Sequence, residues 1–117
     1  MGILSPEEFA RRVVEHLVAH GGSDVLLLDL RGLTVIADYF VIGTVESSTQ
    51  MRSFRDAMDS ALATEFAVHP NFEGEFGDGW VLADFGATIV HVFSPDARTY
   101  FRLEELWADA PTILHVQ

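Results

Sequence analysis

The hydrophobic positions near the start of the chain recur at the spacing of an amphipathic helix. Ser5, Pro6 and Glu8 form its expected start, because a serine cap, an early proline and a glutamate three residues after the cap are typical of helix N-termini. The apolar stripe that follows consists of Phe9, Ala10, Val13, Val14, Leu17 and Val18. Gly21 and Gly22 are expected to end this helix.

The next apolar segments change from helical to strand character. Residues 24–30 form a near-continuous aliphatic run, which is typical of a strand covered on both faces. Residues 39–42 form a second run of aromatic and β-branched side chains, also read as a strand. Residues 46–49 then resemble a helix cap, and an amphipathic helix follows with its spaced positions at Met51, Phe54, Arg55, Met58, Leu62 and Phe66.

The second half of the chain predicts a hairpin and a last helix. Residues 69–72 are expected to form a short strand, and residues 76–79 a turn. Residues 80–85 and 88–93 read as two strands joined through Gly86 and Ala87. A helix is expected from Ser94 to about Trp107, whereas residues 112–117 show no clear pattern.

The order α-β-β-α-β-β-β-α predicts the fold class. It indicates an α/β (α+β) domain, in which helices pack on one mixed sheet of about five strands. A chain of 117 residues, 49% of them hydrophobic, fits a single domain spanning residues 1–117 with a real core.

Charge narrows the range of expected partners. The chain has 18 acidic residues against 7 basic ones, all of them arginine, and a formal net charge of −11. Nucleic-acid binding usually needs a basic face that displaces phosphate counterions, so we expect no direct nucleic-acid readout and no membrane partner. A basic protein partner suits this charge. A role of the charge in solubility alone stays open.

Cysteine content and targeting signals bear on the expected chemistry and location of the protein. The chain has no cysteine, which excludes disulfides and thiolate metal sites. No apolar segment approaches the length of a membrane span, and the first residues lack the features of a secretory signal. We therefore expect a cytoplasmic protein.

Histidines are the first candidates for chemistry. His16 and His20 lie four residues apart on the first helix, but the glutamate of a zinc-protease motif is missing between them. We interpret them as part of a solvated helix face and expect no metal site. His91 lies within a strand, and Asp84 lies on the preceding one, so a hydrogen-bonded pair of structural character is the favoured interpretation.

Sequence motifs for catalysis or cofactor binding are missing. The chain has no GxGxxG, no P-loop, no nucleophile elbow and no Asp-x-Asp pair, and without lysine it cannot supply a P-loop lysine. We therefore predict no catalytic residue, no cofactor and a protein that is not an enzyme.

The two tryptophans are candidates for an interaction surface, although a core position is an equally open interpretation for each. Trp80 follows a turn at the mouth of a strand, close to Asp84 and Phe85, and tryptophan is enriched among interface hot spots. An exposed Trp80 beside an aspartate would suit docking to a basic partner.

Four segments in the same order resemble the signature of the ribosomal silencing factor family, also called Iojap-like. The matching stretches are DLRGLT with ADYFVI (residues 29–34 and 37–42), QMR (50–52), GWVLADFG with VHVF (79–86 and 90–93), and a closing segment that contains Arg98, Tyr100 and LWADA (106–110). Departures from the family pattern are Thr49, the 43–46 loop and Ala87, which bear on local loop contacts.

The resemblance implies a function. Members of this family bind the large ribosomal subunit through its ribosomal protein number fourteen, and so block joining with the small subunit and repress translation. The resemblance also implies a fold similar to nucleotidyltransferases without their catalytic motifs, and a homodimer when the protein is free. The alternatives left open are a degenerate nucleotidyltransferase-like nucleotide-binding protein and an adaptor that works as a dimer.

The expected partner-binding residues come from the segment around the first tryptophan. Strand alternation predicts that Trp80 and Leu82 share one face and that Val81 lies on the other. The full expected set is Trp80, Val81, Leu82, Asp84 and Phe85, with Asp38 and Tyr39 as neighbours.

Overall fold

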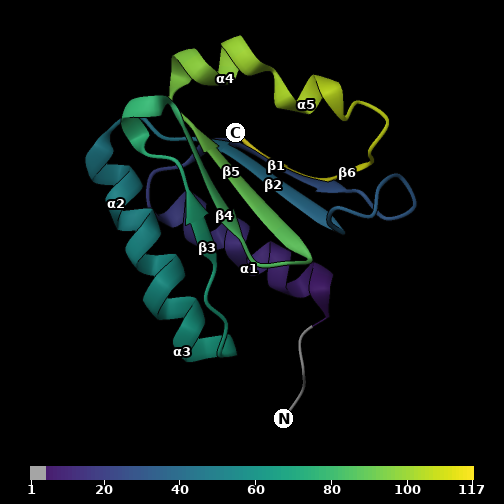
Figure 1. Cartoon of the computed structure of the whole chain (residues 1–117), viewed down its shortest axis with the longest axis horizontal. Helices are drawn as coiled ribbons and strands as arrows, with labels where there is room; N and C mark the ends of the chain where they lie inside the picture. The colour runs from purple at the N-terminus through teal and green to yellow at the C-terminus, as the bar shows by residue number, and fades with distance from the viewer. Residues whose placement is uncertain (1–4) are drawn as a thin grey trace.

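The computed structural model describes residues 5–117, and within this range the strands form one six-stranded sheet in the order β3-β4-β5-β2-β1-β6 (Figure 1). The strands are β1 (Ser23–Asp29), β2 (Tyr39–Thr44), β3 (Asn71–Glu73), β4 (Trp80–Asp84), β5 (Thr88–Phe93) and β6 (Thr112–Val116). β2 and β5 pair in parallel, and the other neighbours pair antiparallel, so the predicted mixed sheet is confirmed.

The sheet has one strand more than the sequence pattern predicted. β6 pairs antiparallel with β1 at one edge of the sheet. Its register with β1 shifts between Leu27 and Leu28, as at a β-bulge. Such an irregularity breaks the alternation by which a strand is recognised, and this explains why residues 112–117 showed no pattern.

The first helix, α1 (Pro6–Ala19), begins and ends where the sequence predicted. The hydroxyl of Ser5 accepts a hydrogen bond from the backbone N–H of Glu8 (3.2 Å), as expected for an N-cap. Residues Ala10, Val13, Val14 and Leu17 of this helix are buried against the sheet.

The long helix predicted after residue 49 consists of three consecutive segments. They are α2 (Ser48–Asp56), a π-helical turn η1 (Ala57–Ala61) and α3 (Leu62–Phe66). The predicted apolar stripe is confirmed, because Met51, Phe54, Met58 and Leu62 are all buried in the same cluster as α1. A short 3-10 turn, η2 (Phe76–Asp78), precedes β4.

The last predicted helix is divided into α4 (Pro95–Phe101) and α5 (Leu103–Leu106). The division lies at Arg102, whose φ of 48° places it in the left-handed region and ends α4. Nothing in the local sequence indicates a left-handed residue here, since arginine rarely adopts this conformation.

Two hydrophobic clusters lie on opposite faces of the sheet. Figure 1 shows α1 on one side of the sheet and α4 with α5 on the other. α1, α2 and η1 share the first cluster with Val81, Ala83, Val90 and Val92. Leu103 of α5 and Ala97 of α4 share the second cluster with Phe40, Ile42, Ile89 and Phe93. The short α4–α5 pair therefore covers the second face less completely than the long helices cover the first.

Candidate functional site

Strand β4 presents alternate side chains to the two faces of the sheet. Val81 (0% exposed) and Ala83 lie in the first cluster, whereas Trp80 and Leu82 pack at the margin of the second. Trp80, Leu82 and Asp84 are all half-buried. The prediction that Trp80 and Leu82 share one face and Val81 the other is confirmed.

Aromatic rings surround Trp80 on the face that carries α4. The centroid of its ring lies 4.9 Å from that of Phe93 on β5 and 4.9 Å from that of Phe101 at the end of α4. Gly79, just before it, has a φ of 83°, a conformation that glycine adopts without strain. Trp80 is thus anchored at one edge and remains partly accessible to solvent.

His91 contacts Trp80, and the predicted His91–Asp84 pair is wrong. In the antiparallel register His91 lies opposite Leu82, and Asp84 lies opposite Ile89. The Asp84 carboxylate accepts a hydrogen bond from the backbone N–H of Gly86 (2.7 Å), whereas Nδ1 of His91 accepts one from Nε1–H of Trp80 (3.1 Å). Burial lowers the pKa of His91 to about 4, so its imidazole is neutral at neutral pH.

An acidic margin lies next to Trp80 and Leu82. Glu73 of β3 pairs with Leu82 in the register, and Asn71 pairs with Asp84. Both β3 side chains are exposed, and so is Asp78, two residues before Trp80. The β3–β4 part of this face therefore combines an apolar centre with carboxylates around it.

The remaining residues predicted for partner binding do not all lie on this surface. Tyr39, which is 1% exposed, lies in the first cluster with Val81, so neither side chain faces solvent. Asp38 is half-buried just before β2, where its backbone N–H donates to the carbonyl of Ala87 (2.8 Å). Of the predicted set, Trp80, Leu82 and Asp84 therefore form one surface.

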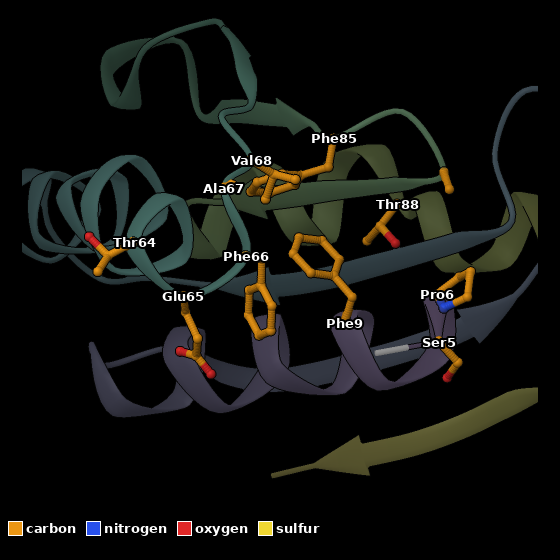
Figure 2. A pocket seen from close by; sticks show the side chains of 11 residues that line it. Ser5, Pro6, Phe9, Thr64, Glu65, Phe66, Ala67, Val68, Phe85 and Thr88 are labelled. Carbon is orange, nitrogen blue, oxygen red and sulfur yellow. The ribbon is translucent and has the colours of Figure 1, made fainter. Parts of the chain in front are cut away.

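Phe85 lies on the other side of the sheet, beside α1 (Figure 2). Its ring contacts that of Phe9 at 5.1 Å between centroids, and Phe9 contacts Phe66 at 5.4 Å. These aromatic rings line a hollow of about 560 Å³ between the start of α1, the end of α3 and the β4–β5 turn. Phe85 therefore belongs to this hollow and not to the Trp80 surface.

His16 lies on α1, and His20 follows its last residue as the C-cap. Nδ1 of His20 lies 2.5 Å from Oγ of Ser53, a contact that joins α1 to α2. Burial is the main cause that lowers the pKa of His16, and the charge of the neighbouring His20 lowers it further. Among residues 5–117, no group of three or more metal-ligating side chains comes together, and no helix is long and apolar enough to cross a membrane.

Sequence reasoning missed the contribution of α4 and α5 to this face. Tyr100, Phe101 and Leu106 are exposed, and Phe101 contacts Trp80 directly. The adjacent aromatic pair Tyr100–Phe101 was an available signal, because neighbouring positions on a helix point in different directions and cannot both enter one core.

The fold and this surface define a class of protein: a small α+β domain that presents a half-buried tryptophan within an acidic margin. Comparison with known proteins specifies the class further. The family described as ribosomal silencing factor during starvation matches residues 4–117, and the chain belongs to this family.

Individual relatives agree with this assignment. The ribosomal silencing factor RsfS of Bacillus subtilis is 42% identical over 89 residues, which are 75% of each chain. The protein of the same name from Halalkalibacterium halodurans is 32% identical over 110 residues, or 94% of each chain. A crystal structure of a Chromobacterium violaceum protein superposes with a TM-score of 0.81 at 29% identity, covering 90% of this chain and 88% of that one.

Proposed function

We propose that this protein binds the large ribosomal subunit through its ribosomal protein number fourteen and thereby blocks joining with the small subunit. Membership of the silencing-factor family supports a role in translation regulation. The observation that carries the proposal is the Trp80 surface, where an aromatic side chain is accessible on a face that helices cover only in part.

The chemistry of the surface suits a basic protein. Trp80 and Leu82 supply apolar area, which is what interface hot spots use. Glu73, Asp78 and Asp84 surround them with negative charge, and the whole chain carries −11. Ribosomal proteins are rich in cationic side chains, so complementary fields favour this encounter and disfavour bare RNA.

Blocking subunit joining is a steric effect and requires no catalytic group. The proposed protein is accordingly a single-domain, non-enzymatic repressor that acts in the cytoplasm, where ribosomes are assembled. We also propose that the protein forms a homodimer when it is not bound to the ribosome. Because Phe101 is exposed and contacts Trp80, and Tyr100 is exposed next to it, a dimer formed through these two rings would compete with ribosome docking.

A sedimentation experiment tests the proposal. Purified large and small subunits are mixed with the wild-type protein, with a Trp80→Ala, Asp84→Ala variant, and with a Val18→Ala, Glu15→Ala control whose exposed sites lie on α1 across the sheet. We expect the wild type and the control to sediment with the large subunit and to reduce the fraction of joined ribosomes. The Trp80–Asp84 variant should lose both effects while remaining folded.

Two results would contradict the proposal. If the wild type sediments with neither subunit and joining is unchanged, the silencing mechanism does not apply to this chain. In that case the nucleotide-binding alternative is examined by melting the protein with and without nucleoside triphosphates, since a ligand stabilises the state that it binds. If the Trp80–Asp84 variant binds like the wild type, the docking surface lies elsewhere.

A further inference from the structure

The indole of Trp80 is held from inside the protein. Its N–H donates to Nδ1 of His91 (3.1 Å), and the two ring centroids lie 5.7 Å apart. Phe93 and Phe101 pack against other parts of the same ring. Because the only polar atom of the indole is directed at His91, the part of Trp80 that reaches solvent is apolar.

The hydrogen bond determines the state of His91. A nitrogen that accepts from an indole N–H carries no proton, so the neutral imidazole has its proton on Nε2. His91 is only 4% exposed, and its ring packs against Phe40 with centroids 4.5 Å apart and planes at 70°. Nε2 is buried, and within the described part of the chain it has no hydrogen-bond partner.

This arrangement is costly for packing alone. A buried polar group without a partner destabilises a fold, whereas an aliphatic side chain of similar size at the same position would not. A group that lowers stability and at the same time orients a neighbouring side chain is typical of a functional site. The neighbour that His91 orients is the tryptophan at the centre of the docking surface.

We infer that His91 is a positioning residue that holds the Trp80 indole in its docking orientation before the partner arrives. The inference rests on the proposed function of the Trp80 surface. A half-buried tryptophan at the first residue of a strand has other side-chain rotamers available. A protein molecule whose Trp80 occupies one of these other rotamers cannot dock, so its population lowers the apparent affinity. By keeping one orientation populated, His91 lowers the entropy that must be lost on binding.

The first test is a His91→Leu variant, which keeps apolar volume at the site and removes the acceptor. We expect its association rate with the large subunit to fall about three- to tenfold, because the loss of one net hydrogen bond reduces the docking-competent fraction by about this factor. Its dissociation rate should change less, since the bound complex holds Trp80 by other contacts.

A second variant leaves the buried histidine unchanged, in case His91→Leu does not fold. In a Trp107→Phe background, Trp80 is replaced by benzothienyl-alanine, in which a sulfur atom takes the place of the indole N–H. The donor is removed while the ring shape is kept. The association rate should fall by about the same factor relative to the Trp107→Phe protein alone.

The free protein provides a direct readout of the hydrogen bond itself, whereas the association rate reports its effect on docking. The indole N–H resonance of Trp80, assigned with the Trp107→Phe protein, reports directly on its hydrogen bond. We expect this resonance to move and its hydrogen exchange to accelerate in His91→Leu. In the wild type it should stay protected.

The outcomes separate the two proposals. Variants that bind the large subunit with unchanged association rates overturn the positioning role and leave the proposed function intact. An indole resonance that is unmoved in His91→Leu also overturns it. A wild-type protein that does not bind the large subunit overturns the proposed function, and the docking role of His91 with it.

Discussion

The guanidinium of Arg98 connects α4 to the sheet. It is 7% exposed, its Nε donates to Glu104 (3.0 Å), its Nη1 donates to Thr44 (2.9 Å), and its Nη2 lies 3.5 Å from Asp24. We predict that Arg98→Met lowers the free energy of unfolding by about 3 kcal/mol, because Glu104 and Thr44 lose their partner. Urea denaturation measures this loss.

The exposed Arg102 provides the matched control for this substitution. Arg102→Met removes the same charge next to the same helix, but its ion pair with Glu105 and its hydrogen bond to the carbonyl of Thr99 (3.2 Å) are both exposed, so the expected change is below about 1 kcal/mol. Equal losses in the two variants would show that Arg98 contributes only charge and not a buried connection.

The lowered pKa of His91 makes stability depend on pH. Its pKa is about 4 in the folded protein, against 6.5 ordinarily, because burial disfavours the charged ring. Between pH 6.5 and 4 the imidazole of His91 binds a proton in the unfolded chain but not in the folded protein. We therefore predict that the free energy of unfolding falls as pH drops from about 6.5 towards 4, by up to about 3 kcal/mol.

Denaturation curves at pH 7, 6 and 5 measure this slope. His91→Gln should reduce this slope, whatever the absolute stability of the variant, and we expect the slope that remains to come from His16, whose pKa is also lowered by burial. Below pH 5 carboxylates titrate as well, so the comparison is made above it. A wild-type slope in His91→Gln would contradict the assignment.

At the scale of elements, the strand β6 protects an edge of the sheet. Leu114 and Val116 pack against the first cluster beside β1, whereas Thr112 and His115 are exposed. We predict that Leu114→Ser with Val116→Ser lowers the free energy of unfolding by about 3 kcal/mol, since two partly buried aliphatic side chains are lost. The variant should also aggregate more readily, because β1 becomes an unprotected edge.

Thermal denaturation and light scattering check this prediction. The control is Thr112→Ser with His115→Ser at the two exposed positions of the same strand, for which we expect a loss below about 1 kcal/mol, because it removes only the exposed contact of His115 with Asp24. Equal effects of the two pairs would show that β6 is not packed on the sheet.

The elements show which parts of the fold could be predicted from the sequence. α1 and the faces of β4 followed from local signals, namely the Ser5 cap and strict alternation from Trp80 to Asp84. The bulge beside β6 and the left-handed Arg102 are set by tertiary contacts, so no local pattern indicated them. Periodicity reports which face of an element is buried, but not where that element is interrupted.

The site was predictable to the same extent. Trp80 and Leu82 were assigned to one face from alternation alone. Partners across strands depend on register, so the contact of Trp80 with His91 could not be derived from spacing. The position of Phe85 on the face of Val81 follows from the same alternation, which the predicted binding set did not apply to it. The contribution of Phe101 depends on how α4 lies over the sheet, which is a property of the whole molecule.

The charge of the whole molecule predicts how docking responds to salt. With a net charge of −11, the protein is attracted over a distance to a basic partner, and dissolved ions screen this attraction within about 10 Å at 0.1 M salt. We predict that the association rate with the large subunit falls at least about tenfold between about 0.05 M and about 0.5 M salt. The dissociation rate should change much less, because apolar contacts around Trp80 hold the complex.

The position of the charge decides whether the acidic margin itself contributes to this steering. Glu73→Gln removes one charge beside Leu82, and Glu8→Gln removes one charge from α1 across the sheet, so the two variants have equal net charge. Stopped-flow association should slow more for Glu73→Gln at low salt, and the two rates should converge at high salt as the field is screened. Equal slowing at low salt would assign the effect to net charge alone. A wild-type rate that is indifferent to salt would remove electrostatic steering from the mechanism and leave the apolar surface around Trp80 to account for binding.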